Sequence, residues 1–317
     1  MEEHLDYAEV FEKIIQKTSE YLINNNIKAM ILGISGGIDS TVCAVICHEV
    51  SKKTGIPLIG RYLPTRFNKE EETTVADLVG KAFCNDYKIF QIDNIYQDVR
   101  DEFVEDEKQT KLADGNIQAR LRMIYLYNLA SINSGLVIDT DNLTENNLGY
   151  FTIHGDVGDF NPIGGLWKTE VFKLAEYLHE HYSIESYYHE TYSDTKNNDS
   201  EFGRCIAISK SLKLKPTAGL GITDSDLEEI GAESYEQVDY ILQELLAWKW
   251  LSEKRGDKFD TIWAMRDGFL EEQQMLDTPI EVIIAVTDRH FKSEFKRNKL
   301  PVKIDRTLYS FDYIIKK

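Results

Sequence analysis

The spacing of apolar residues predicts alternating strands and helices in the first half of the chain. Val10, Phe11, Ile14 and Ile15 recur at helical spacing, which predicts an amphipathic opening helix. Short apolar runs predict buried strands, and helical periodicity between them predicts helices. The strands are expected at 29–34, 57–63, 87–92 and 136–139, and the helices at 40–53, 70–83 and 115–134. This alternation predicts a parallel sheet with helices on both faces.

The second half of the chain is less regular. Its periodicity predicts helices at 169–181 and 235–251. The polar stretch 193–200 is expected to be an exposed loop. The stretch 215–226 contains Pro, Gly and Thr, and is expected to be a mobile loop.

Composition excludes several classes of protein. The 317 residues are 42% hydrophobic, enough for a full core in one large domain or two modest ones. The net charge of −18 repels phosphate backbones, so nucleic acid is not an expected partner. No apolar run approaches the roughly 18 residues of a membrane span, and no signal peptide is visible. The four cysteines lack zinc-ligand spacing, and a reducing cytoplasm fits them.

The sharpest local motif is Ser35-Gly-Gly-Ile-Asp-Ser40, which lies where the first strand should end and a helix begin. Two glycines let the backbone turn tightly, and the N–H groups of the helix start favour an anion. No lysine follows the glycines, so the motif is not a Walker A loop. On geometry alone, an ordinary strand-to-helix turn capped by serine remains the alternative.

Two carboxylates suggest a metal beside this loop. Asp39 lies inside the loop, where a cation such as Mg²⁺ would reconcile it with phosphates, although it could merely cap the helix. The acidic segment 139–156 follows the fourth predicted strand, and its Glu145 is the expected second metal ligand. Without a match to a known motif, this segment would be taken as a solvated acidic loop.

The basic residues, and one hydroxyl residue near a loop, are less specific. Arg120 and Arg122 are two apart on a predicted helix and face different directions, so one could bind an acidic substrate while the other is structural. A solvated face or surface ion pair is the simpler interpretation of each. Lys168, Thr217 and Lys296 lie near loops and say little alone.

Taken together, these segments resemble the ammonia-dependent NAD synthetase family of the ATP pyrophosphatase (PP-loop) superfamily. The matching segments run in order along the chain. They are 33–41 (ATP loop), 115–123 (substrate helix), 139–156 (metal and substrate loop), 161–169 (phosphate-binding lysine) and 215–218 (start of a lid), with a weaker match at 293–301. The resemblance implies a Rossmann-like, doubly wound sheet of the adenine nucleotide α-hydrolase type, and a homodimer.

The resemblance also implies roles for individual residues. Asp39 and Glu145 would hold Mg²⁺, and deamido-NAD would contact Arg120, Asp159 and Lys296. Catalytic roles fall to Lys168, and to Asp156 as the group that accepts or orients the proton of ammonium. The residues implied to contact ATP are Gly33, Ile34, Ser35, Gly36, Gly37, Ile38, Asp39, Ser40, Thr140, Lys168 and Thr217.

The chain departs from the family pattern on the dinucleotide side. Ile153 stands where the family often has lysine, and Phe295 precedes Lys296 where it often has histidine. The chain, interpreted as one domain over 1–317, also carries an apparent helix-rich insertion at about 241–288 to which the sequence assigns no function.

The implied reaction is ATP-dependent amidation of deamido-NAD by ammonia through an adenylated intermediate, with release of AMP and pyrophosphate. Ammonia is the expected nitrogen donor, because only one helix precedes Ile27 and no cysteine precedes Cys43 to serve a glutaminase. One alternative is a sister adenylating enzyme, either one similar to GMP synthetase or a tRNA-modifying member, and the acidic charge disfavours the latter. The other alternative is a non-catalytic ATP-binding module, which the Asp39–Glu145 pair disfavours.

Overall fold

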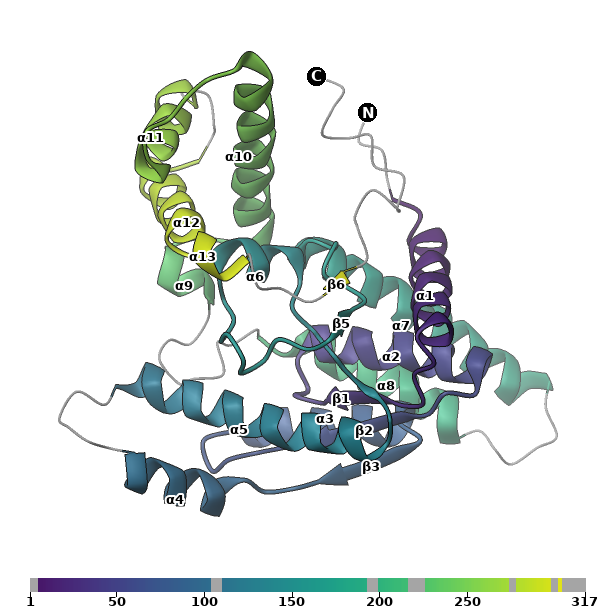
Figure 1. Ribbon diagram of the computed structural model, residues 1–317. Coiled ribbons are helices and arrows are strands. Elements are labelled where there is room, and N and C mark those ends of the chain that lie inside the picture. The colour runs from purple at the N-terminus through teal and green to yellow at the C-terminus, as the bar shows by residue number, and fades with distance from the viewer. Residues whose placement is uncertain are drawn as a thin grey trace.

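A single parallel sheet, built mainly from the first half of the chain, organises the fold (Figure 1). The computed structural model describes residues 5–103, 110–192, 199–215, 226–273, 278–297 and 302–303. Within them the sheet has six strands in the order β3-β2-β1-β4-β5-β6, all paired in parallel. The strands are β1 Met30–Gly33, β2 Leu58–Tyr62, β3 Asp86–Ile89, β4 Leu136–Ile138, β5 Phe160–Asn161 and β6 Val302–Lys303.

Helices cover both faces of this sheet. Along β1, Met30 and Leu32 belong to a core cluster with α1, α2 and α7, whereas Ile31 packs on the opposite face with α5. Successive side chains of a strand point to opposite faces, so this division is that of a doubly wound sheet, as predicted. The helices of this part are α1 Tyr7–Asn24, α2 Ile38–Thr54, α3 Glu70–Phe83, α4 Asp93–Phe103, α5 Lys111–Ile132, α6 Leu143–Leu148, α7 Lys168–Tyr192 and α8 Asp199–Lys213.

The strand order fixes where a ligand can bind. From β1 the chain proceeds to β2 and β3 on one side, and then returns to β4 on the other side. Parallel sheets of this kind bind ligands outside the carboxyl ends of the two strands at which the order reverses. In this chain that position lies between the segments that follow β1 and β4.

A second group of helices stands beside the sheet (Figure 1). Its members are α9 Asp226–Ile230, α10 Tyr235–Arg255, α11 Ile262–Glu272, α12 Ile280–Lys292 and α13 Glu294–Arg297. They pack around Ile241, Leu245, Trp248 and Phe269, and the same cluster includes Trp167, directly before α7. The helices α10, α11 and α12 lie mainly in the range 241–288, where the sequence predicts a helix-rich insertion. No helix among the described residues has the length and apolarity needed to cross a membrane.

Several expected boundaries differ. The helix α4 was not predicted, because its apolar positions are few and Ile95 is exposed. The helix α7 continues past His181 to Tyr192, and α8 begins at Asp199, inside the expected polar loop. The rest of that loop, 193–198, and residues 216–225 of the expected mobile loop lie outside the described residues.

Candidate active site

The Ser35–Ser40 loop joins β1 to α2 and is held by its own serines. Gly36 has φ +88°, and a Cβ there would lie 2.7 Å from the Glu72 carbonyl oxygen, so only glycine fits. The hydroxyls of Ser35 and Ser40 are 2.9 Å apart, and Gly37 N donates to Ser35 Oγ at 3.2 Å. These bonds hold the turn that follows the carboxyl end of β1, where the two glycines predicted a tight turn.

A residue from another helix supports the same loop. Ser211 of α8 is buried and donates from Oγ to the Gly36 carbonyl oxygen at 3.1 Å. Its Oγ also accepts from Thr41 Oγ1 at 2.9 Å. Sequence reasoning missed Ser211, and no local signal marks it, since only folding brings α8 to the loop.

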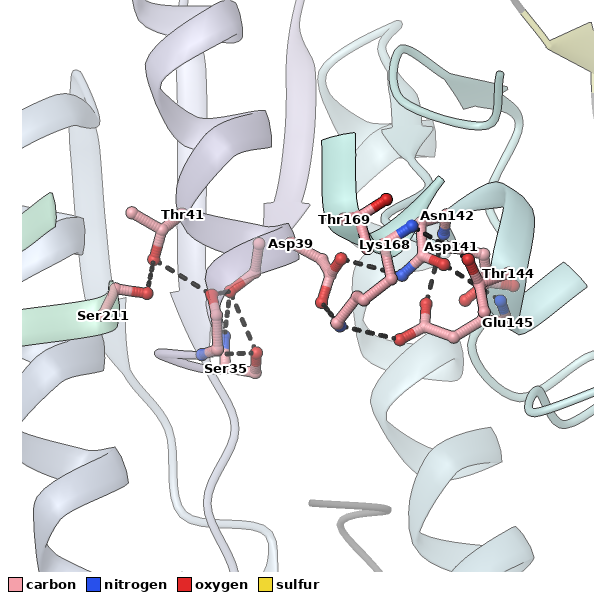
Figure 2. Close-up of polar contacts among 12 residues, drawn as sticks. Ser35, Asp39, Thr41, Asp141, Asn142, Thr144, Glu145, Lys168, Thr169 and Ser211 are labelled. Atoms are coloured by element: carbon pink, nitrogen blue, oxygen red, sulfur yellow. Dashed lines mark hydrogen bonds and ion pairs between the residues drawn. The ribbon is translucent and has the colours of Figure 1, made fainter. Parts of the chain in front are cut away.

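A buried lysine joins the two predicted metal ligands (Figure 2). Lys168, at the start of α7, is 2% exposed, and its Nζ lies 2.5 Å from Asp39 Oδ2 and 3.1 Å from Glu145 Oε1. Burial by itself would lower the pKa of Lys168, but the Asp39 and Glu145 carboxylates raise it above its ordinary value. The ammonium is therefore charged, and supplies the positive field that the acidic chain needs beside the loop.

Asn142 orients both carboxylates. Its Nδ2 donates to Asp39 Oδ1 at 2.9 Å, and its backbone N donates to Glu145 Oε2 at 3.1 Å (Figure 2). Glu145 N donates in return to Asn142 Oδ1 at 2.9 Å, which completes a capping box at the start of α6. Sequence reasoning assigned Asn142 no role, although the Asn-x-x-Glu spacing is a visible signature of this motif.

The acid pair suits a magnesium ion. Asp39 and Glu145 come from different helices, yet their carboxylates contact one and the same cationic group. Mg²⁺ is usually bound through one or two carboxylates together with substrate phosphates. No larger group of potential metal-ligating side chains occurs among the described residues. Asp39 and Glu145 are thus the residues that would hold the ion.

Two of the remaining predicted nucleotide contacts lie at the carboxyl ends of β1 and β4. Gly33 ends β1, Thr140 follows β4 half-buried, and Thr217 lies outside the described residues. Ile34 and Ile38 have side chains buried in the core, so only their backbone can face a ligand.

Two of the three predicted dinucleotide residues lie beside the segment 149–156. Lys296 of α13 donates from Nζ to the carbonyl oxygens of Gly149 and Phe151, at 2.7 and 2.6 Å. Arg120 is exposed, and its Nη2 lies 3.5 Å from the Ile153 carbonyl oxygen. Both cations therefore lie beside the same loop, Arg120 exposed and Lys296 half-buried.

Asp159 faces a different environment. Its Oδ1 accepts from the Tyr127 hydroxyl at 3.1 Å, and its Oδ2 accepts from Val137 N at 2.9 Å. Both oxygens thus hold β4 and α5 in place, and its predicted substrate contact stays a prediction.

The carboxyl group of Asp156 has a pKa far above the ordinary value for aspartate. Its Oδ1 accepts from Thr152 N at 2.7 Å. The pKa of Asp156 is raised to about 7, mainly because the surrounding chain desolvates the carboxylate. The Thr152 hydrogen bond, Lys296 and Arg120 oppose this shift, and Asp139 adds to it. The residue as a whole is exposed, so solvent moderates the effect. A carboxylate tuned toward neutral pH is suited to accept a proton.

The glycine loop lies at the point where the strand order reverses, with a lysine and a pair of carboxylates beside it. These features define an α/β nucleotide-binding protein equipped for phosphate chemistry. The chain belongs to the NAD synthase family, whose sequence model matches residues 10–300. It is 35% identical to the NH(3)-dependent NAD(+) synthetase of Campylobacter jejuni over 179 residues, 56% of this chain and 70% of that protein.

A second relative matches almost the whole chain. The NH(3)-dependent NAD(+) synthetase of Thermococcus sibiricus is 29% identical over 300 residues, 94% of this chain and 97% of its own length. Among solved structures, NMN synthetase from Francisella tularensis has a similar fold, with a TM-score of 0.67 and 24% identity, covering 94% of this chain and 98% of that one. The predicted family and fold are therefore confirmed.

Proposed function

We propose that this chain is an ATP-dependent ligase that amidates deamido-NAD with ammonia to form NAD, AMP and pyrophosphate. The observation that carries the proposal is Lys168 held between Asp39 and Glu145 beside the Ser35–Ser40 loop, in a member of the NAD synthase family. This arrangement provides cationic and N–H groups for the phosphates of ATP and carboxylates for its magnesium.

The first step forms an acyl-adenylate. An oxygen of the nicotinate carboxylate attacks the α-phosphorus of ATP, the bond to the bridging α–β oxygen breaks, and pyrophosphate leaves. Lys168 and the loop N–H groups hold the phosphates and oppose the charge that develops on them. Bound magnesium would supply Lewis-acid stabilisation of the same charge.

The second step transfers nitrogen to the acyl carbon. Ammonia attacks that carbon, the bond to the AMP oxygen breaks, and AMP leaves as the amide forms. The nitrogen must lose one proton, and Asp156 is the proposed acceptor, because its raised pKa makes it basic near neutral pH. Arg120, Asp159 and Lys296 are proposed to hold the acid substrate, and Thr140 and Thr217 to contact ATP.

The test is to identify the products. Purified protein is incubated with ATP, Mg²⁺, ammonium and deamido-NAD, and nucleotides are separated by chromatography while pyrophosphate is assayed. AMP, pyrophosphate and NAD should appear in equal amounts. ADP and orthophosphate as stoichiometric products would refute the proposal.

A parallel series replaces deamido-NAD with other acids. Nicotinate mononucleotide is included because a similar fold belongs to an NMN synthetase. Xanthosine monophosphate represents a sister amidotransferase. A higher kcat/KM for either acid would reassign the substrate, and absence of turnover with all three, despite ATP binding, would favour a binding module.

We also propose that the protein is a cytoplasmic homodimer. The outer side of α5 exposes Ile124 (66%), Tyr127 (38%) and Ile132 (70%), an apolar stripe that a second copy would cover. Light scattering coupled to gel filtration should give twice the monomer mass of 36.6 kDa. Ile124→Glu should shift the mass to that of a monomer.

We further propose that 1–317 form one domain in which 241–288 are an insertion. The apolar cluster of α10–α12 includes Leu148 and Trp167, which flank the site, so these helices share a core with the sheet region.

A further inference from the structure

The helix α10 reaches the active site with a buried carboxylate. Asp239 is 2% exposed and lies one turn into α10. Its Oδ2 accepts from Thr169 N at 3.0 Å and from Thr169 Oγ1 at 2.8 Å. Its Oδ1 accepts from Thr144 Oγ1. One side chain thus gathers three donors from two other helices.

These bonds connect the two halves of the phosphate site. Thr144 precedes Glu145 on α6, and its Oγ1 accepts from the backbone N of Lys168 at 2.8 Å (Figure 2). Asp239 therefore links the turn that carries the acid ligand to the first residues of the helix that carries the lysine. Its negative charge also lies at the N-terminus of α7, where a helix favours an anion.

A second residue of α10 contacts the same lysine. The ring of Tyr235 lies 5.6 Å from Lys168 Nζ, within the range of a cation–π interaction. Tyr235 and Asp239 are four residues apart, so they share one face of α10. Lys168 is thereby held at both ends, its backbone through Thr144 and its ammonium against the ring.

A contact that served only to pack α10 against its neighbours would not need a carboxylate at position 239. An apolar side chain at position 239 could pack α10 against α6 and α7 without the cost of burying a carboxylate. The carboxylate instead satisfies donors whose direction determines where Lys168 and Glu145 lie.

We propose that Asp239, assisted by Tyr235, is a positioning residue that sets the spacing of Lys168 and Glu145 for the phosphates of ATP. Its effect on turnover rests on the proposed function, whereas its effect on ATP binding does not. The proposal gives α10, which runs from before residue 241 into the predicted insertion, a task in the active site.

The experiment compares Asp239→Ala with Leu245→Ala, using the full-length protein. Leu245 is fully buried on the same helix and belongs to the apolar cluster, so its truncation controls for loss of stability. Calorimetry measures the Kd of ATP with Mg²⁺, with no acid substrate present, at a temperature where both variants are folded by circular dichroism. Steady-state kinetics then gives KM for ATP and for deamido-NAD separately.

Asp239→Ala should weaken ATP binding roughly 10- to 100-fold, as removal of groups that orient metal ligands commonly does, and should raise KM for ATP but not for deamido-NAD. Leu245→Ala should leave the ATP Kd unchanged. Tyr235→Leu should weaken ATP binding less than Asp239→Ala does, and Tyr235→Phe, which keeps the ring, should restore it.

An unchanged ATP Kd in folded Asp239→Ala, or equal weakening in Leu245→Ala, would overturn the proposal. Should Asp239→Ala not fold, Asp239→Asn is used instead. It keeps the volume, but its amide NH₂ cannot accept the hydrogen bonds of the oxygen that it replaces, which are two at Oδ2 and one at Oδ1. The same criteria apply to it. Weakened ATP binding in a protein that makes no NAD would support the positioning role and refute the proposed reaction.

Discussion

The Nζ of Lys168 lies 2.5 Å from Oδ2 of Asp39, and this buried ion pair joins the nucleotide loop to the start of α7. Glu145 completes the contact from the other side at 3.1 Å. The lysine therefore occupies the point between the two carboxylates where a metal ion would bind. Competition between the lysine and a metal ion for the two carboxylates can therefore be measured through protein stability, without following the reaction.

Lys168→Met should destabilise the protein and make it more responsive to magnesium. Removing one partner of a buried ion pair leaves charge uncompensated, and we expect a loss of roughly 3 kcal/mol, the low end of the known range, since both carboxylates are partly exposed. Magnesium chloride without ATP should raise the Tm of this variant more than that of wild type, because the ion no longer competes with the ammonium. The exposed Lys173→Met on the same helix is the control. Equal magnesium shifts in all three proteins would show that the carboxylates do not bind the ion.

Asp39→Asn and Glu145→Gln should each lower kcat by about 100-fold or more and should affect the fold far less. A metal clamp contributes several kcal/mol to stabilising a phosphoryl transition state, and about 1.4 kcal/mol corresponds to tenfold in rate. Rates are measured across a magnesium titration, with Asp77→Asn, a surface ion-pair residue, as the control. Full turnover by either variant at limiting magnesium would argue against the metal role.

The free energy of unfolding should fall as pH rises from about 4 to 7, and Asp156 should account for part of the fall. Its pKa is raised from 3.8 to about 7 in the folded protein, so the folded state binds more protons than the unfolded state in this window. The contribution is present below pH 4 and is lost as pH rises through 7. Urea denaturation at pH 5 and 8 should show a smaller difference in Asp156→Asn than in wild type or in the exposed control Asp101→Asn. A difference unchanged in Asp156→Asn would contradict this.

Ile153→Lys should lower the apparent KM for deamido-NAD and leave that for ATP nearly unchanged. The family resemblance puts a cation at this position, and the Ile153 backbone lies beside Arg120, on the proposed substrate side. A charge-assisted hydrogen bond contributes about 1.5–3 kcal/mol, or roughly tenfold or more in affinity. If the variant binds both substrates equally weakly, Ile153 is a packing residue and the assignment of the dinucleotide side is wrong.

Phe295→Ala tests the second departure from the family pattern. Phe295 is 63% exposed, so it does not fill the core and its truncation should leave stability nearly unchanged. A ring that stacks on nicotinate or adenine contributes about 1–3 kcal/mol, and its loss should raise KM for deamido-NAD correspondingly. Steady-state kinetics with each substrate in turn decides whether the ring takes part.

Ammonium, and not glutamine, should support turnover by the purified chain. Glutamine hydrolysis of the kind found in amidotransferases requires a reactive thiolate. Burial raises the pKa of both Cys43 and Cys47, and raises the pKa of Cys84 to about 12. Equal rates with glutamine and ammonium would show that another nucleophile releases ammonia.

The sequence by itself determined the features that depend on near neighbours in the chain. Apolar runs separated by helical periodicity predicted the order of β1 to β4 and the helices α2, α3 and α5 between them, because burial on a sheet face or helix stripe imposes those periods. The helix α4 was missed. The Ser35–Ser40 loop was equally predictable, since a tight turn before a helix needs glycine at Gly36. The capping box of Asn142 and Glu145 also depends only on residues close together in the sequence.

Only the tertiary structure decided which of these residues meet. Lys168, Asp39 and Glu145 lie on three different helices, and their contact depends on the strand order that places β1 beside β4. Ser211 and Asp239 carry no signal along the chain, because a serine or an aspartate within a helix is most simply a solvated residue. Their roles arise from long-range packing, which brings α8 under the loop and α10 against the start of α7. Periodicity specifies which face of a helix is buried, but not which partner that face meets.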